Sequence, residues 1–327
     1  MNSCYAAGMS ASRPDWRKLV LMVLVMVPFL MAGPVLAKSS VKPQGEGFSS
    51  PEAAVKALVE AARKADSQAI LKVLGDNALD LVFSGDTVEG KTEAENFVKH
   101  YQEKHLLRKL SESEYELLIG ADGWPFPIPV IKVGDKWYFD VEAGREELLN
   151  RRIGRNELTA IQVLLAYVNA QLEYASRDRD GDGILEYAQK IRSDPGKKNG
   201  LYWPVKPGEE PSPFGPMIAQ AAAEGYQASD QPQPYHGYYF KIITRQGRNA
   251  PGGAYDYIVN GNMILGFGMI AWPARYGVSG IMTFAVNQEG VIYQCDLGEK
   301  TSEIIQKMVK YNPDEHVWRK VSQRDME

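Results

Sequence analysis

Residues 156–175, NELTAIQVLLAYVNAQLEYA, form the stretch that organises the C-terminal half of this chain. Asn156 is a favourable residue for a helix N-cap. The apolar residues after it recur at spacings of three and four, and they are Leu158, Ile161, Leu165, Val168 and Leu172. This spacing is typical of an amphipathic helix with one buried face, so we expect a helix from Asn156 to about Ala175.

Short strands with clear turn signals follow this helix. We expect strands at residues 238–244, 254–259, 263–272, 280–286 and 291–295. Asn260-Gly261 and the four-residue loop 287–290 are both hairpin signatures. A closing helix is expected at 301–311. Residues 151–327 therefore predict a domain in which a long helix lies on an antiparallel β-meander.

Residues 50–150 predict a separate α+β domain. Ser50-Pro51-Glu52 is a helix start, with a capping side chain, Pro at the first position and an acid in the first turn. Thr92 with Glu95 has the pattern of a capping box before a later helix. The other expected elements are a helix at 67–74 and strands at 79–83, 115–119, 128–133 and 136–139. This element order resembles the nuclear-transport-factor-2-like cone, in which a curved sheet wraps a long helix.

The two expected domains meet at residues 144–157, GREELLNRRIGRNE, which we interpret as a hinge. Arg151, Arg152 and Arg155 are close together there. Three arginines in one place are suited to hold a phosphate or a carboxylate. The alternative is that they are solvated or paired with neighbouring glutamates, as exposed charge clusters usually are.

The N-terminus has the three parts of a secretory signal. Basic residues precede the apolar run 19–36, and a polar stretch follows it. Val35-Leu36-Ala37 is a relaxed cleavage pattern, so residues 1–37 predict a signal peptide cut near Ala37 and residues 38–49 a flexible leader. The alternative is an uncleaved anchor, because the run is near the lower limit of a membrane span. Either way, we expect the chain in the periplasm or cell envelope, with membrane contact only through this segment.

Composition limits the class of protein. Hydrophobic residues make up 44% and charged residues 24% of the chain, which is ordinary for a globular protein. The net charge of −4 argues against a broad basic face, so we expect no nucleic-acid partner. The two cysteines, Cys4 and Cys295, are too few for a disulfide framework. Signal cleavage would leave Cys295 alone, and we expect it to be a buried small apolar residue.

The stretch DRDGDGILE at 178–186 carries a candidate metal site. Asp178, Asp180 and Asp182, followed by Gly183, reproduce the first half of a calcium-binding loop, and Glu186 stands at its ninth position. Gln189 replaces the glutamate that closes such a loop, so we expect weak binding and a structural role for calcium. The alternative is an Asp/Gly turn whose carboxylates are solvated. We expect no other cofactor.

Several long phrases resemble one bacterial exported family, domain of unknown function 2950. They include RRIGRNEL at 151–158, YASRDRDGDGILEYAQ at 174–189, GLYWP at 200–204 and PYHGYYFKIIT at 234–244. The resemblance extends over nearly the whole chain after the signal and implies export. It implies no activity and no catalytic residues. The C-terminal half is also similar to the heads of type IV pilin-like proteins, but its helix begins at 156, so we expect no filament subunit.

These observations favour a non-catalytic binding or assembly module of the cell envelope, whose partner is an envelope protein or a glycan. The alternative is a hydrolase that acts on an envelope polymer through an aromatic-lined cleft around residues 235–257. Its conceivable triad is His236, Asp256 and a serine such as Ser279. No nucleophile-elbow motif accompanies these residues, so we expect no catalytic residues.

Overall fold

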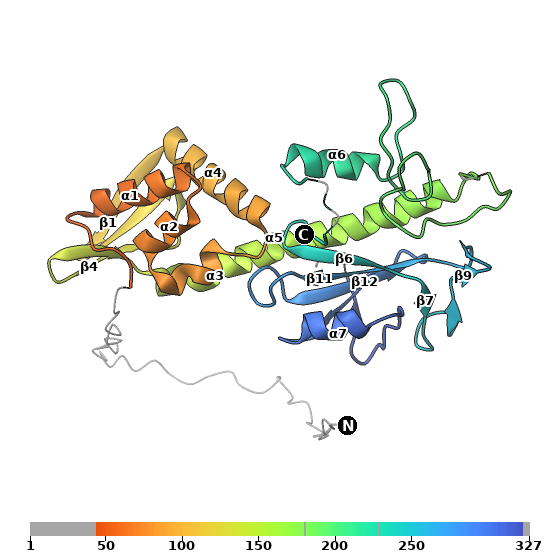
Figure 1. Ribbon diagram of the computed structural model, residues 1–327. Helices are drawn as coiled ribbons and strands as arrows, with labels where there is room; N and C mark the ends of the chain where they lie inside the picture. The colour runs from red at the N-terminus through yellow and green to blue at the C-terminus, as the bar shows by residue number, and fades with distance from the viewer. Residues whose placement is uncertain (1–43, 180, 228, 230, 323–327) are drawn as a thin grey trace, which may run out of the picture. The chain divides into compact units, whose positions relative to one another are not determined.

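The computed structural model describes residues 44–322, apart from residues 180, 228 and 230. The predicted signal peptide, Cys4 and Asp180 lie outside the described residues. Within the described part of the chain, every helix is too short or too polar to span a bilayer. The fold is α+β, with antiparallel sheets in both halves (Figure 1).

The N-terminal half packs helices against a curved antiparallel sheet. Its helices are α1 (Pro51–Arg63), α2 (Ser67–Leu74), η1 (Asp76–Ala78), α3 (Leu79–Val82) and α4 (Thr87–Glu103). Its strands are β1 (His105–Ser111), β2 (Glu114–Ile119), β3 (Trp124–Pro125), β4 (Val130–Val133) and β5 (Lys136–Phe139). The sheet order is β1-β2-β4-β5, with β3 paired to β2. The buried core lies between this sheet and the helices α1 and α2.

Two sequence predictions in this half are wrong, and one strand was missed. Residues 79–83, expected as a strand, form the helical turn α3. The helix α4 begins after Asp86 rather than at Thr92, since the Asp86 side chain caps the backbone N–H groups of Val88 and Glu89. The strand β1 was not predicted; its residues are mostly exposed, so no apolar alternation marks it.

Helix α5 (Val141–Tyr174) is continuous through the expected hinge. Asn156, predicted as an N-cap, is therefore an interior helical residue, and it is fully buried. The hinge prediction depended on the charged residues of this segment. They stay helical because acids and arginines one turn apart pair along the helix, as Glu147 and Arg151 do.

The C-terminal half is a meander of five strands in the order β6-β11-β12-β13-β14. These are β6 (Tyr238–Ile243), β11 (Gly268–Pro273), β12 (Met282–Asn287), β13 (Tyr293–Asp296) and β14 (Arg319–Lys320). Smaller ladders pair β7 (Arg245–Gln246) with β8 (Tyr255–Asp256) and β9 (Ile258–Val259) with β10 (Asn262–Met263). The turns predicted at 260–261 and 287–290 are confirmed by these pairings.

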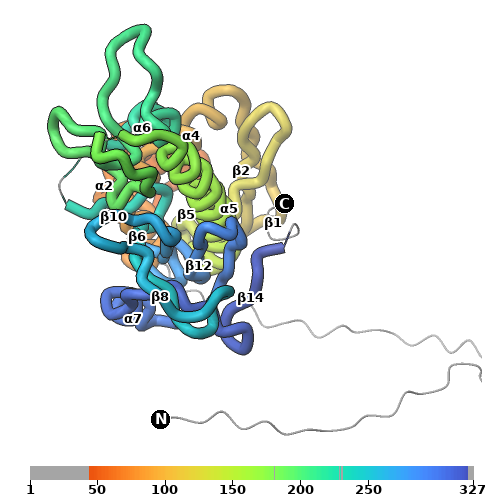
Figure 2. Tube along the Cα trace, turned by 90° about the vertical axis from the view of Figure 1, so that its right-hand side faces the viewer, coloured from red at the N-terminus to blue at the C-terminus, as the bar shows by residue number. Residues whose placement is uncertain are grey.

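This sheet is covered on both faces. One face packs on α5, as the predicted helix-on-meander arrangement requires, and α5 lies beside β12 in Figure 2. The other face packs on α7 (Thr301–Lys307) and contains Cys295, a buried free cysteine as predicted. The remaining helix, α6 (Gly215–Ala223), belongs to the long connection between α5 and β6.

Candidate functional site

A large open cavity of about 1500 Å³ lies in the N-terminal half. Its walls come from the helices α1 to α5 and the strands β2 and β3. The C-terminal half adds residues between α6 and β6 and also Arg275. Most of its surface is apolar, and this part includes Leu58, Leu81, Phe97, Ile119, Phe126 and Ile128. Binding sites for small molecules are commonly of this kind, concave and apolar with few polar groups.

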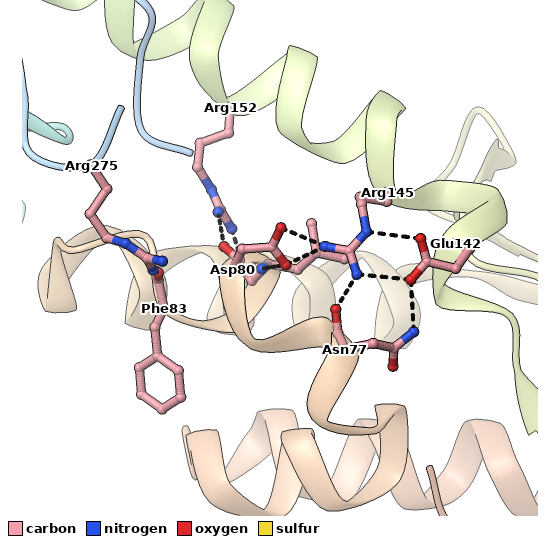
Figure 3. A network of polar contacts seen from close by, with 8 residues as sticks. Asn77, Asp80, Phe83, Glu142, Arg145, Arg152 and Arg275 are labelled. Atoms are coloured by element: carbon pink, nitrogen blue, oxygen red, sulfur yellow. Dashed lines mark hydrogen bonds and ion pairs between the residues drawn. The ribbon is translucent and has the colours of Figure 1, made fainter. Parts of the chain in front are cut away.

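Three arginines fix the turn that borders this cavity (Figure 3). Arg145 and Arg152 of α5 bind the η1–α3 segment: Arg145 pairs with Asp80, and Arg152 donates to the backbone oxygens of Asp80 and Leu81. From the C-terminal half, Arg275 donates to the backbone oxygen of Phe83. The last carbonyls of a short helix lack partners within the helix, so these guanidinium groups both satisfy them and hold the cavity wall.

The N-terminal end of α4 joins the two halves. The buried Asp86 caps α4 with one carboxylate oxygen. Its other oxygen accepts hydrogen bonds from the Tyr226 hydroxyl at 2.9 Å and from the backbone N–H of Gly237 at 3.1 Å. A Cβ at position 237 would stand 2.6 Å from Nδ2 of Asn156, so only glycine allows this approach. The Asp86 carboxylate therefore ties the start of α4, on the cavity wall, to the segment that precedes β6.

Glu89, in the first turn of α4, is the unusual group of the cavity. Its exposed fraction is only 6%, and neither of its carboxylate oxygens accepts a hydrogen bond from the described part of the chain. Burial raises the pKa of Glu89, and the charge of Glu93 adds to this rise; Arg152 and the Asn156 amide act in the other direction. A buried carboxylate without a partner is costly, which marks Glu89 as a functional candidate.

The arginine cluster predicted at 151–155 is paired rather than free. Arg152 and Arg155 both bind Glu93 of α4, and Arg151 binds Glu147 within α5. The Arg151 guanidinium also lies 4.4 Å from the ring centre of Trp124 at the cavity edge. Pairing with a neighbouring glutamate, the alternative predicted from the sequence, occurs for Arg151 and Glu147. Arg152 and Arg155 instead pair with Glu93, which comes from another helix. These arginines therefore line the cavity as ion pairs.

The conceivable hydrolase triad is not assembled. Nε2 of His236 lies 2.8 Å from Glu224, and Asp256 pairs with Arg245 at 3.1 Å. The buried hydroxyl of Ser279 donates to the backbone oxygen of Gly237. Each of the three residues therefore has a separate structural role. Burial alone would raise the pKa of Glu224, but hydrogen bonds from Gln220, His236 and Tyr235 hold it below its usual value.

The aromatic residues near 235–257 are mostly packed rather than arranged around a cleft. Tyr238 and Tyr257 are fully buried in the core beside α5. Tyr239 packs on Trp272, with ring centres 5.6 Å apart. His236, however, has a left-handed backbone with φ of 46°, which is rare outside glycine. Its backbone N–H donates to the Tyr226 hydroxyl, and this bond helps to hold the strained conformation.

The Asp/Gly loop is tied to the β9–β10 hairpin. Asp178 accepts backbone hydrogen bonds from Gly181 and Gly183. Asp182 accepts from the Asn262 side chain at 3.3 Å, and Glu186 accepts from the backbone of Met263 at 3.3 Å. Among the described residues, which leave out Asp180, no three His, Cys, Asp or Glu side chains are grouped to hold a metal ion.

Sequence reasoning missed the two buried acids of the cavity, Asp86 and Glu89. One signal was present: Asp86-Thr87-Val88-Glu89 has an acidic N-cap residue with Glu three positions later. That pattern starts α4 one and a half turns before Thr92 and places Glu89 in its first turn. The partners of this segment, Tyr226 and Gly237, are more than 100 residues away in sequence, so only the fold could reveal them.

Comparison with known proteins gives a single result. No curated protein and no solved structure matches the chain. One family model matches residues 45–321, which include every residue of the cavity and of the Asp/Gly loop. The chain therefore belongs to the family described as protein of unknown function DUF2950, as its sequence phrases predicted.

Proposed function

We propose that this protein is a non-catalytic binding protein of the cell envelope that holds a small, mainly apolar molecule in the cavity of its N-terminal half. The observation that carries the proposal is the cavity of about 1500 Å³ with its apolar wall. Burial of apolar ligand surface supplies the driving force for such binding, at about 25 cal/mol per Å². The envelope protein or glycan expected from the sequence remains a predicted partner.

The packing around the cavity supports a stable site rather than a transient opening. Arginine contacts hold α3 at one side, and Asp86 holds the start of α4 at another. Phe97 of α4 packs on Phe126, with ring centres 5.2 Å apart, on the apolar wall. Helices and a curved sheet around a cavity also support the nuclear-transport-factor-2-like arrangement as a proposal for residues 50–150. The similarity of the C-terminal half to pilin-like heads likewise remains a proposal.

Export to the envelope rests on the sequence of residues 1–37. The expected result of cell fractionation is a shortened chain in the periplasmic or envelope fraction. Full-length chain in the cytoplasmic fraction would contradict export. It would leave the proposal for the cavity untouched, because ligand binding does not depend on the compartment.

The experiment for the cavity uses the neutral apolar fluorophore N-phenyl-1-naphthylamine. We expect its emission to rise on binding to the purified chain and to saturate. Ala94 lines the cavity on α4, so Ala94→Phe fills the space beside the apolar wall and should weaken binding about tenfold or more. The matched control is Ala143→Phe on the exposed side of α5, which should bind as the natural chain does.

The proposal fails if the fluorophore does not bind the natural chain, or if Ala94→Phe binds it unchanged while circular dichroism shows both to be folded. The hydrolase alternative would be favoured instead if the chain released product from an envelope polymer and a substitution of His236 abolished the release.

A further inference from the structure

The cavity has a polar end and an apolar end. Glu89 and Phe97 both line it from α4 and are eight residues apart. At 1.5 Å per residue, this spacing is about 12 Å along the helix axis. Between them, Gly90 and Ala94 are the small residues of the lining, beside the polar side chains of Lys91, Thr92, Glu93 and Asn96. The space along this side of α4 therefore suits an elongated molecule with one polar end.

The charged groups near the polar end are balanced, with one exception. Asp86 accepts hydrogen bonds from Tyr226 and from three backbone N–H groups. Glu93 pairs with Arg152 and Arg155. Farther along the wall, Glu224 pairs with His236. Of these four carboxylates, Glu89 is the one whose two oxygens are both buried and without a hydrogen bond from the residues that the structure describes.

Arg152 is the cation that acts on the pKa of Glu89, but it makes no hydrogen bond to it. The guanidinium of Arg152 already donates to Glu93 and to the backbone oxygens of Asp80 and Leu81. The other groups that act on the pKa of Glu89 or respond to its charge are Asp86, Glu93 and Tyr226, none of which is a cation. Lys91 also lines the cavity from α4, and it pairs with the exposed Glu95. The local environment therefore favours a positive group that enters from the cavity.

We propose that the cavity binds an amphipathic cation, an ammonium group with an apolar tail, in which Glu89 is the counter-ion and the tail lies along α4 toward Phe97 and Phe126. This inference rests on the proposed binding function and names the class of its ligand. A charge-assisted hydrogen bond in a site of low dielectric would satisfy the carboxylate that the fold leaves unpaired. A ligand with a carboxylate head would instead meet a buried acid with like charge.

The test is displacement of bound N-phenyl-1-naphthylamine by decylammonium, decanol and decanoate, which share one tail and differ in the head group. For the natural chain at neutral pH, we expect decylammonium to displace the fluorophore at a concentration about tenfold below that of decanol, with decanoate the weakest. The quantity compared is the ratio of the displacement constants of decylammonium and decanol, measured within each variant. This ratio cancels any change that affects the two compounds equally.

Glu89→Gln keeps the shape of the side chain and removes its charge, so the ratio should fall to about one. The control Glu95→Gln lies on the same helix, exposed and outside the cavity, and should keep the natural ratio. The preference for ammonium should also grow as the pH rises and Glu89 loses its proton.

The inference is wrong if the three compounds displace the fluorophore equally from the natural chain, or if Glu89→Gln keeps the ammonium preference. In both cases fluorophore binding itself would still support the proposed function. Failure of the fluorophore to bind the natural chain would overturn the proposed function and this inference together.

Discussion

At the scale of single residues, Glu89 and Asp86 show how two neighbouring acids acquire opposite roles. Both are buried at the start of α4. Asp86 accepts hydrogen bonds from its own helix and from Tyr226 and Gly237. Among the described residues, no donor has hydrogen-bond geometry to either oxygen of Glu89, and burial raises its pKa more than the nearby Asn156 amide lowers it. Asp86 therefore serves structure, whereas Glu89 is available to a ligand.

Glu89 should make the stability of the unliganded chain depend on pH. Because its pKa is raised in the folded chain, the folded state keeps a proton that the unfolded state releases. The contribution of Glu89 to the free energy of unfolding is fully present below its ordinary pKa of 4.5. It is lost as the pH rises through the raised pKa of the folded chain. Glu89→Gln should therefore increase the free energy of unfolding by about 1–3 kcal/mol at neutral pH and change it little at acidic pH.

Urea denaturation of both chains at acidic and neutral pH measures this difference, with Glu95→Gln as the control. A loss of stability in Glu89→Gln at neutral pH would mean that the carboxylate has a stabilising partner after all, and the interpretation of Glu89 as unpaired would be wrong.

Asp86 should be far more costly to remove than an ordinary N-cap. Asp86→Ala loses the cap of α4 together with the bonds from Tyr226 and Gly237, so the free energy of unfolding should fall by about 2–4 kcal/mol. Asp66 is the matched control, because it caps α2 through Gln68 and Ala69 and is exposed. Asp66→Ala should cost about 1 kcal/mol. Equal losses in thermal or urea unfolding would refute the joining role of Asp86.

At the scale of elements, α5 decides how the chain is organised. It carries the arginines that hold α3 and continues beneath the C-terminal sheet. The predicted buried face is confirmed at Ile161 and Val168 and wrong at Leu165 and Leu172, which are exposed by 39% and 51%. The buried face instead includes Tyr167, Gln171 and Tyr174. Gln171 binds the backbone of Ala188, so a polar residue occupies a core position that an apolar pattern cannot reveal.

Two glycines within α5 should respond oppositely to alanine. At Gly154 an added Cβ meets no heavy atom within 4 Å, so Gly154→Ala should stabilise the chain by about 0.5–1 kcal/mol through helix propensity. At Gly144 the Cβ would stand 2.5 Å from the backbone oxygen of Pro127, so Gly144→Ala should destabilise it by about 1–3 kcal/mol. Thermal unfolding of both variants decides this, and a stabilised Gly144→Ala would show that α5 does not pack on residue 127.

At the scale of the whole molecule, calcium remains a structural proposal for the loop of Asp178, Asp180, Asp182 and Glu186. This loop contacts the β9–β10 hairpin through Asp182 and Glu186. Bound calcium would stabilise the folded state by mass action. We expect millimolar calcium to raise the melting temperature by a few degrees, as extracellular sites of low affinity do.

Replacing both Asp180 and Asp182 by alanine should abolish this rise, since it removes two of the candidate ligands. Magnesium serves as a second control, because it demands stricter octahedral geometry. An equal rise in the double variant would place calcium elsewhere, and no rise in the natural chain would leave the loop as a hydrogen-bonded Asp/Gly turn.

The sequence by itself determined the elements whose signals are local. The helix over 67–74, the β4–β5 hairpin and the meander turns at 260–261 and 287–290 follow from caps, glycines and alternation, which act within a few residues. The phrases that place the chain in its family are also local. These features needed no knowledge of distant contacts, because backbone preferences alone produce them.

Only the tertiary structure decided the continuity of α5, its buried face and the cavity. The pairing of Arg152 with Glu93, the meeting of Asp86 with Tyr226, and the absence of a partner for Glu89 among the described residues all depend on segments far apart in sequence. Whether a carboxylate is paired is set by what the fold places within about 3 Å of it. That distance is fixed by packing between elements, and no residue pattern within one element contains it.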